Sequence, residues 1–281
     1  MPSRSPRRKT SSRENAPPIA LLTDFGYRDH YAGVMRGVIA TIAPSARVID
    51  ITHGIPPQSV TAGAIALAQS RPFFPKRTVF LTIVDPGVGT SRLPIAIDTR
   101  TGARFVGPDN GVLYLAAKDA GISRIVELRA SKYRLKNISS TFHGRDIFAP
   151  AAAWLWSGTP ITALGPPRSQ MTQLSVGTAE QRGTTLAGKV IYVDGFGNLV
   201  SNIDRRSLDA FAASFRAAPL LVRIAKGTPM KIFQAYGDVP PGAPLATVGS
   251  FELLEIAVRD GSAASSYGLA AGAPVTVIVS T

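Results

Sequence analysis

The chain has 281 residues, of which 45% are hydrophobic and 17% are charged, a composition typical of a soluble globular protein with enough apolar material for two domains. It contains no cysteine, which excludes disulfides, thiolate metal sites and a cysteine nucleophile and fits a reducing compartment such as the cytoplasm. No apolar run is long enough to predict a membrane-spanning helix.

Part of the net charge of +13 lies in the first residues of the chain. The segment 1–17 is rich in Ser, Pro and Arg and has little apolar surface to bury, so we expect a disordered basic arm. Its Arg7-Arg8 pair is similar to a twin-arginine export signal, but no apolar segment follows, which disfavours export. The remaining basic residues form no stripe, and specific nucleic-acid binding is not indicated.

Short apolar runs alternate with helical patterns over the first half of the chain. Strands are expected at 18–23, 47–51, 78–84, 93–98 and 104–107, and helices at 30–43, 59–70 and 145–156. This alternation predicts an α/β N-terminal domain over 18–178, with a parallel-rich sheet flanked by helices. Asp29 is placed to cap the first helix.

The pattern changes after residue 185. Strands are expected at 188–193, 220–224, 245–248, 253–258 and 274–279, and a helix only at 205–216. Turn pairs such as Asp194-Gly195 separate the strands. The sequence therefore predicts a smaller, mostly-β C-terminal domain over 179–281, either a barrel or a sandwich.

Polar motifs follow two of the expected strands. Asp24 follows the first strand in TDFG, and the third strand runs into DPGVGTSR, which contains Asp85 and Arg92. Ligands of α/β proteins collect at the carboxyl ends of the strands, so these residues are candidate site residues. The alternative for DPG is an ordinary turn. A phosphate-binding loop is disfavoured because its lysine is absent.

His143 lies in TFHGRD, in a loop that opens the helix 145–156, where functional residues are common. The three histidines His30, His53 and His143 have no metal-ligand spacing, which disfavours zinc and leaves only a carboxylate magnesium site open. In DGFGNL, an aromatic face at Phe196 and an amide at Asn198 suit a flat heteroaromatic such as adenine, or form a β-turn.

Taken in order, seven motifs make a more specific pattern than any one alone. They are TDFGYRDHYAGVMRG, DITHGIPPQ, FFPKRTVFLTIVDPGVGTSR, GPDNGVL, TFHGRDIFAPAAA, DGFGNLVSNI and LLEIAV. The sequence resembles the S-adenosylmethionine hydroxide adenosyltransferase family, also called S-adenosyl-L-methionine hydrolases, which are relatives of the fluorinases and chlorinases. The resemblance covers nearly everything after residue 17.

The resemblance implies an α/β N-terminal domain, a C-terminal β-barrel and a homotrimer whose ligand lies between one subunit's N-terminal domain and a neighbour's C-terminal domain. It implies S-adenosylmethionine as substrate, no cofactor and no metal. The residues it implies for catalysis are Asp85, Arg92 and His143. Those it implies for substrate binding are Asp24 at the ribose, Asp194 at the methionine amino group, and Phe196, Asn198 and Tyr236 at adenine.

The implied reaction is an attack of water at C5′ that releases neutral methionine. The sulfonium needs no acid to leave, so the protein must mainly hold and activate the water. Asp85 and His143 are both candidate proton acceptors, and Arg92 can fix Asp85 or stabilise hydroxide character. A carboxylate in the pocket repels a halide, which favours a hydrolase over a halogenase. A non-catalytic sensor of S-adenosylmethionine or adenosine is the alternative of a different class.

Overall fold

The computed structural model describes residues 16–216 and 218–280, which divide into two compact units between Leu174 and Ser175. Most of the basic arm predicted for 1–17 lies outside the described residues. Each unit has its own hydrophobic core. The two units are therefore described one at a time.

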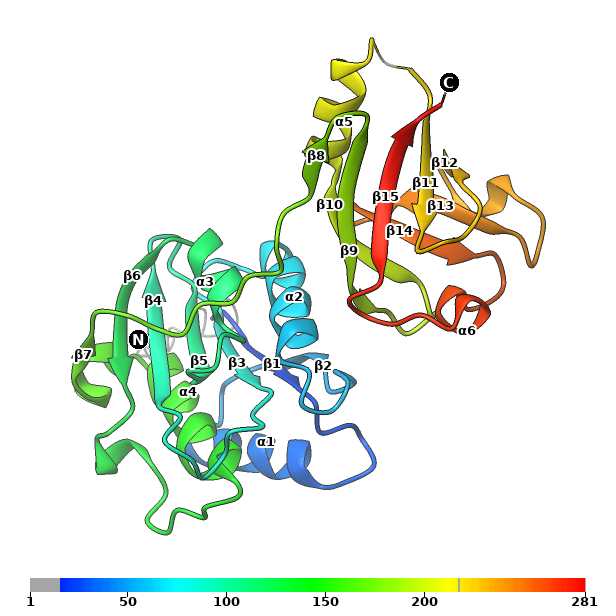
Figure 1. Ribbon diagram of the computed structural model, residues 1–281. Coiled ribbons are helices and arrows are strands. Elements are labelled where there is room, and N and C mark those ends of the chain that lie inside the picture. The colour runs from blue at the N-terminus through cyan, green and yellow to red at the C-terminus, as the bar shows by residue number, and fades with distance from the viewer. Residues whose placement is uncertain (1–15, 217, 281) are drawn as a thin grey trace, which may run out of the picture. The chain divides into compact units, whose positions relative to one another are not determined.

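The N-terminal unit is a mixed sheet with helices on both faces (Figure 1). Its strands are β1 (Ile19–Thr23), β2 (Val48–Thr52), β3 (Val79–Ile83), β4 (Pro94–Thr99), β5 (Arg104–Pro108), β6 (Ile122–Glu127) and β7 (Pro167–Arg168). Its α-helices are α1 (Tyr31–Ile42), α2 (Val60–Ser70), α3 (Tyr114–Asp119) and α4 (Ala149–Trp156), and a π-helical turn, Gly144–Phe148, precedes α4.

The strand order of this sheet is β2-β1-β3-β5-β4-β6-β7. Strands β2, β1, β3 and β5 pair in parallel, which confirms the expected parallel-rich sheet with flanking helices. β4 runs antiparallel to both of its neighbours, because the short link between β4 and β5 can only make a hairpin. The motifs after β1 and β3 therefore meet at one edge, since parallel strands end on the same side of a sheet.

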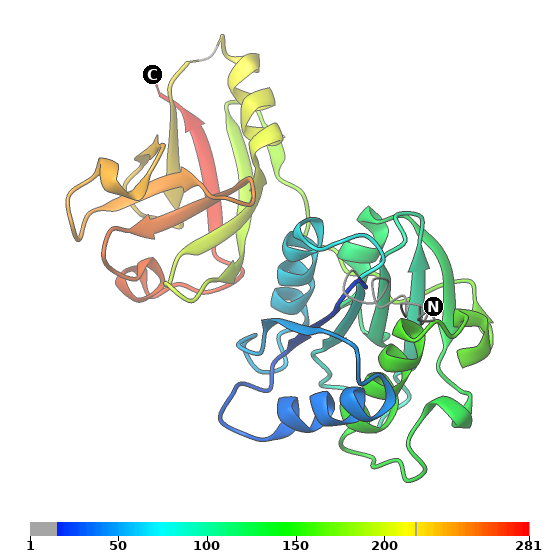
Figure 2. The same cartoon turned by 180° about the vertical axis from the view of Figure 1, so that it is seen from behind.

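The central strands are buried on both faces. Every residue of β1 and β3 is buried, as is typical of a parallel strand between two helical layers. Right-handed crossovers from β1 to β2 and from β2 to β3 run in opposite directions along the sheet, and so they place α1 and α2 on opposite faces. α1 packs with α4, and α2 packs with α3, as the two views show (Figures 1 and 2).

The predicted cap of α1 is wrong. The helix begins at Tyr31, and its N-cap residue is His30, whose side chain makes no capping hydrogen bond. His30 already has helical backbone angles, and its carbonyl accepts the N–H of Val34 at 2.9 Å. Asp29 therefore lies one residue before the capping position.

The C-terminal unit is a closed β-barrel, which confirms the expected fold (Figure 1). Its strands are β8 (Glu180–Arg182), β9 (Thr185–Val193), β10 (Leu199–Asp204), β11 (Leu220–Ile224), β12 (Met230–Phe233), β13 (Pro244–Val248), β14 (Leu253–Val258) and β15 (Pro274–Val279). Its helices are α5 (Arg205–Ser214) and α6 (Ala263–Tyr267).

The barrel closes because β10 pairs with both β14 and β9. The closing circuit is β9-β10-β14-β13-β12-β11-β15, and β8 extends it as a flap on β9. α5 packs Leu208 and Phe211 into the barrel core, and Asp204 caps it by accepting the N–H of Ser207 at 2.7 Å. Closure leaves no long unpaired edge for another chain to join.

Within the described ranges, no helix is both long and apolar enough to cross a membrane.

Candidate active site

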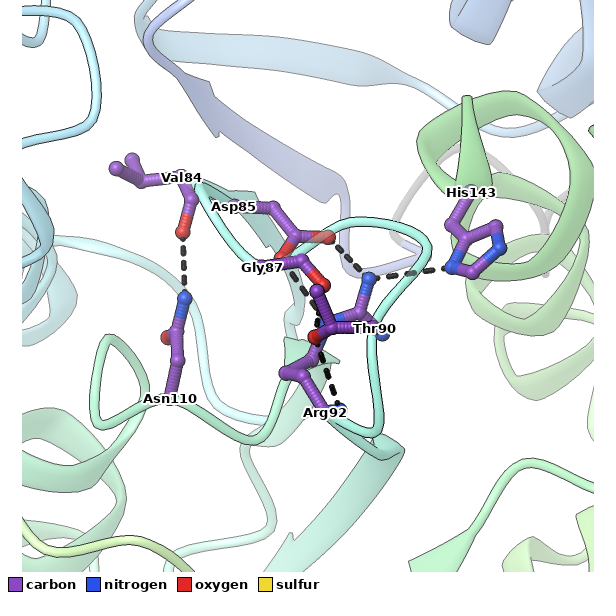
Figure 3. Close-up of polar contacts among 7 residues, drawn as sticks. All are labelled: Val84, Asp85, Gly87, Thr90, Arg92, Asn110 and His143. Carbon is purple, nitrogen blue, oxygen red and sulfur yellow. Dashed lines mark hydrogen bonds and ion pairs between the residues drawn. The ribbon is translucent and has the colours of Figure 1, made fainter. Parts of the chain in front are cut away.

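Asp85, Arg92 and His143 meet at the carboxyl end of the N-terminal sheet (Figure 3). Asp85 lies two residues after the end of β3, and Arg92 lies two residues before β4, so both belong to one loop between rigid strands. His143 is the residue immediately before the π-helical turn that leads into α4. The structure thus brings together three residues that the sequence separates by up to 58 positions.

Arg92 is at the centre of this cluster. Its Nε donates to Asp85 Oδ1 at 2.9 Å, and its Nη2 donates both to Asp85 Oδ2 and, at 3.1 Å, to His143 Nδ1. The side chains of Asp85 and Arg92 are each only 6% exposed. The Phe148 ring lies 5.3 Å from the guanidinium carbon and supplies a cation–π contact. This two-pronged pairing holds the Asp85 carboxylate in one plane.

Burial in this cluster shifts the pKa values of Asp85 and His143. Burial raises the pKa of Asp85, and the opposing attraction of Arg92 does not cancel that effect. Burial and the nearby Arg92 charge lower the pKa of His143. At neutral pH, His143 is therefore an uncharged imidazole, and Asp85 is a stronger base than an exposed carboxylate.

The direction of the Arg92–His143 hydrogen bond fixes the tautomer of the histidine. A guanidinium has only donors, so His143 Nδ1 must accept. In the neutral ring the proton then lies on Nε2. His143 therefore presents a donor, not an acceptor, with its free nitrogen.

Hydrogen bonds within and between the loops hold the side chains of this cluster in place. Thr90 Oγ1 donates to the Gly87 carbonyl at 2.7 Å, and Asn110 Nδ2 donates to the Val84 carbonyl at 2.8 Å (Figure 3). In the other loop, the buried Asp146 accepts the Ser139 N–H at 2.8 Å and pairs with Arg145. Burial alone would raise the pKa of Asp146, but these hydrogen bonds lower it.

The two loops pack closely against each other at Gly89. This residue has φ +78°, and a Cβ built on it would lie 2.5 Å from the Ser140 carbonyl oxygen. Only glycine fits both the backbone conformation and the space. Gly89 thus allows the loop of Asp85 and Arg92 to pack against the loop of His143.

A cavity of about 650 Å³ opens beside this cluster. Its lining includes Asp85, His143, Phe142 and Asp24, so Asp24 reaches the same space from the end of β1. Asp24 Oδ2 accepts the N–H of Gln58 at 2.8 Å. The site therefore combines two carboxylates, an imidazole and an aromatic wall.

The Asp24 loop is anchored by the fully buried His53. His53 Nδ1 hydrogen-bonds Thr23 Oγ1 at 2.7 Å, and the His53 carbonyl accepts the N–H of Gly26 at 2.7 Å. Burial, followed by the charge of Arg36, lowers the pKa of His53. This histidine has the packed, structural role that is common for a lone histidine.

The remaining predicted residues lie in the C-terminal unit. Phe196, Asn198 and Tyr236 line a second cavity of about 730 Å³, with Arg259 and Val258 among the other lining residues. Phe196 is 81% exposed, so this aromatic side chain is open to a ligand.

Asp194 begins the tight turn that carries two of these lining residues. Its carboxylate accepts the N–H groups of Phe196 and Asn198, both at 2.9 Å, and the side-chain amide of Asn198 at 2.9 Å. In this structure Asp194 therefore holds the turn that carries Phe196 and Asn198.

Glu255 is a contact of the predicted site residue Tyr236 that the sequence analysis did not identify. It is buried, and it accepts the hydroxyl of Tyr236. Burial, with the Asp194 charge, raises the pKa of Glu255 although the Tyr236 hydrogen bond opposes this effect. A Cβ on Gly249 would lie 2.5 Å from a Glu255 carboxylate oxygen. The signal in the sequence is an acidic residue inside the apolar strand LLEIAV.

Across the described ranges, His, Asp and Glu side chains form no group of three or more arranged to hold a metal ion.

Comparisons with known proteins give matches to both units of the chain. Residues 19–165 match the model of the SAM hydroxide adenosyltransferase N-terminal domain, and residues 188–276 match that of its C-terminal domain. The (R)-S-adenosyl-L-methionine hydrolase of Thermus thermophilus is 37% identical over 93% of this chain and 99% of its own length.

This chain is also similar to a solved structure and, more distantly, to a fluorinase. The crystal structure of an uncharacterized conserved protein from Thermotoga maritima superposes with a TM-score of 0.84 at 38% identity, over 92% of this chain and 99% of that one. The fluorinase of Actinoplanes sp. is 25% identical over 93% of this chain and 97% of its own length.

Substituting Gly89 with alanine tests the close approach of the two loops. Gly158→Ala is a matched control, because Gly158 also has positive φ, +99°, but open space around its Cβ position. We expect the control to cost about 1 kcal/mol from backbone strain and Gly89→Ala to cost roughly 1–3 kcal/mol more. Urea unfolding measures both values. Equal losses would show that the Ser140 contact places no constraint on the loop.

Proposed function

The chain belongs to the SAM hydroxide adenosyltransferase family, and we propose on this basis that it hydrolyses S-adenosyl-L-methionine to adenosine and L-methionine. The observation that carries the proposal is the buried Asp85–Arg92–His143 cluster beside the cavity of the N-terminal unit. The reaction is an in-line displacement at C5′ with water as the nucleophile.

The chemistry of the substrate explains what the protein must supply. A bond forms between the water oxygen and C5′, while the C5′–S bond breaks and its electron pair neutralises the sulfonium. The thioether leaves without needing an acid, so no general acid is required. The protein must instead orient the water, remove its proton and exclude bulk solvent.

Asp85 is the proton acceptor in this proposal, and His143 is the donor that positions the water. The argument is that His143 Nδ1 already accepts from Arg92 and that its Nε2 carries the ring proton. Each carboxylate oxygen of Asp85 keeps a further lone pair after pairing with Arg92. The raised pKa of Asp85 strengthens it as a base, and the lowered pKa of His143 weakens the imidazole as one.

Substrate binding completes the proposal. Asp24 binds the ribose hydroxyls. The adenine is enclosed by Phe196, Asn198 and Tyr236. Asp194 lies on the side of the methionine amino group. The support is that the first four of these residues line the two cavities and that Asp194 bonds the lining residue Asn198. We further propose that the protein needs no metal or other cofactor and acts in the cytoplasm as a homotrimer. Each ligand would contact the N-terminal unit of one copy and the C-terminal unit of a neighbour.

The reaction products test the function directly. Incubation with S-adenosylmethionine in EDTA, followed by chromatography, should yield adenosine and methionine in equal amounts. Asp85→Asn should lower kcat by at least about 100-fold, because the proton acceptor is lost while the shape is kept. Binding without any turnover by the unaltered protein would favour a sensor, and turnover only with added halide would favour a halogenase.

The pH dependence tests the assignment of Asp85. Because Asp85 must be ionised to accept the proton, kcat should fall as the pH falls through its pKa, which lies above the ordinary value of 3.8. The pKa of His143 lies below 6.5, so its protonation adds no loss above that pH. An acid limb that persists unchanged in His143→Gln supports Asp85. An acid limb that disappears in His143→Gln would assign the proton acceptor to His143 instead.

Mixing two impaired variants tests whether neighbouring copies share a site. Asp85→Asn damages only the N-terminal unit and Asn198→Ala only the C-terminal unit. In co-expressed mixed trimers, about a quarter of the interfaces should combine two intact halves and regain activity. Co-expression of Asp85→Asn with His143→Ala, both in the N-terminal unit, is the control and should regain none. Equal activity in both mixtures would contradict a shared site.

A further inference from the structure

The side-chain amide of Asn198 has a fixed orientation. Its Nδ2 donates to Asp194 Oδ2 at 2.9 Å, while Asp194 Oδ1 accepts the backbone N–H of Asn198, also at 2.9 Å. An ionised carboxylate can only accept hydrogen bonds, so the amide must turn its NH₂ group toward Asp194. The carboxylate thus settles an orientation that an isolated asparagine leaves open.

The edge of the Asn198 amide that Asp194 leaves free has a defined hydrogen-bonding polarity. Asp194 also binds the Asn198 main-chain N–H, so it takes the amide hydrogen on the main-chain side. Oδ1 then remains as an acceptor, with the second Nδ2 hydrogen beside it as a donor. Asn198 is 6% exposed and lines the cavity that it shares with Phe196 and Tyr236.

An acceptor beside a donor matches one type of purine edge. Adenine presents its 6-amino group as a donor next to N7 as an acceptor, and asparagine reads this pair with two hydrogen bonds. A 6-oxopurine such as hypoxanthine presents two acceptors at the same places. Its O6 would face Asn198 Oδ1, oxygen against oxygen.

We propose that Asp194 is a specificity-determining residue, which fixes the Asn198 amide so that the cavity of the C-terminal unit accepts 6-aminopurines and rejects 6-oxopurines. The proposal rests on the proposed function for its substrate. It gives Asp194 a role at the purine, through Asn198. The contact with the methionine amino group, by contrast, is implied by the family resemblance alone.

The substitution Asp194→Asn reverses the predicted selection. Its side-chain oxygen can keep the N–H groups of Phe196 and Asn198, and its NH₂ group then faces the Asn198 amide. Asn198 must turn its oxygen toward that NH₂ group, which exchanges the positions of its donor and its acceptor at the cavity. The variant therefore loses both hydrogen bonds to a 6-aminopurine, whereas a 6-oxopurine exchanges its hydrogen bond at N7 for one at O6. A general loss of structure would instead lower kcat/KM for both substrates alike.

The experiment compares S-adenosyl-L-methionine with its 6-oxo analogue S-inosyl-L-methionine. In the unaltered protein, kcat/KM should favour the 6-amino substrate by about 10- to 100-fold. Asp194→Asn should shift this ratio toward the 6-oxo substrate by at least about tenfold. Asp209→Asn, the same chemical change at an exposed position of α5, should leave the ratio unchanged.

Two further measurements keep the proposal open to refutation. Asn198→Ala, which removes the amide, should bring the ratio close to one, and this variant decides the matter if Asp194→Asn fails to fold. Calorimetry with adenosine and inosine measures the same preference without turnover. Preferential adenosine binding without hydrolysis would refute the proposed function and support this inference. Equal use of both substrates, or an unchanged ratio in Asn198→Ala, would overturn the inference alone.

Discussion

The pairing of two buried charges, Asp85 and Arg92, places the strictest demand on the N-terminal unit. An unpaired charge in such a place costs several kcal/mol, so each side chain is tolerable only while the other holds its position. This requires a rigid support, which the wholly buried strand β3 and the start of β4 provide. The loop between them can then carry reactive groups without adapting its shape. The close packing at Gly89 extends the same constraint to the loop of His143.

A second principle links the two units. Imidazole tautomers and amide orientations are ambiguous by themselves, and in each cavity a group with only one hydrogen-bonding polarity removes the ambiguity. Arg92, which only donates, makes His143 Nδ1 an acceptor and leaves Nε2 as a donor. Asp194, which only accepts, turns the NH₂ group of Asn198 toward itself. Each fixed charge thus determines the hydrogen-bonding polarity that its neighbour offers, His143 to the cavity of the N-terminal unit and Asn198 to that of the C-terminal unit.

The sequence predicts most of this fold where its signals are local. The continuous apolar run of β3 and the spacing of α1 predict their elements, and the polar residues after β1 and β3 predict the site edge. β10 escapes prediction because its Ser201 and Asn202 break the apolar pattern, and the Ser201 hydroxyl bonds the Leu254 carbonyl. Glu255 was missed for a different reason. The role of a carboxylate in a strand cannot be inferred until its hydrogen-bond partner is known, and the partner of Glu255 is Tyr236, 19 positions away.

The choice of nucleophile follows from the same fixed polarities. In the proposed reaction, the nucleophile must give a hydrogen bond to Asp85 and receive one from His143. Water does both, and it becomes more nucleophilic as its proton moves to the carboxylate. A halide has no hydrogen to donate, so it would meet the Asp85 charge without compensation, and burial would strengthen that repulsion. Fluorinases are distant relatives with an overall alignment of nearly full length. A change of nucleophile on this fold therefore requires removal of the carboxylate, which also frees Arg92 to bind an anion.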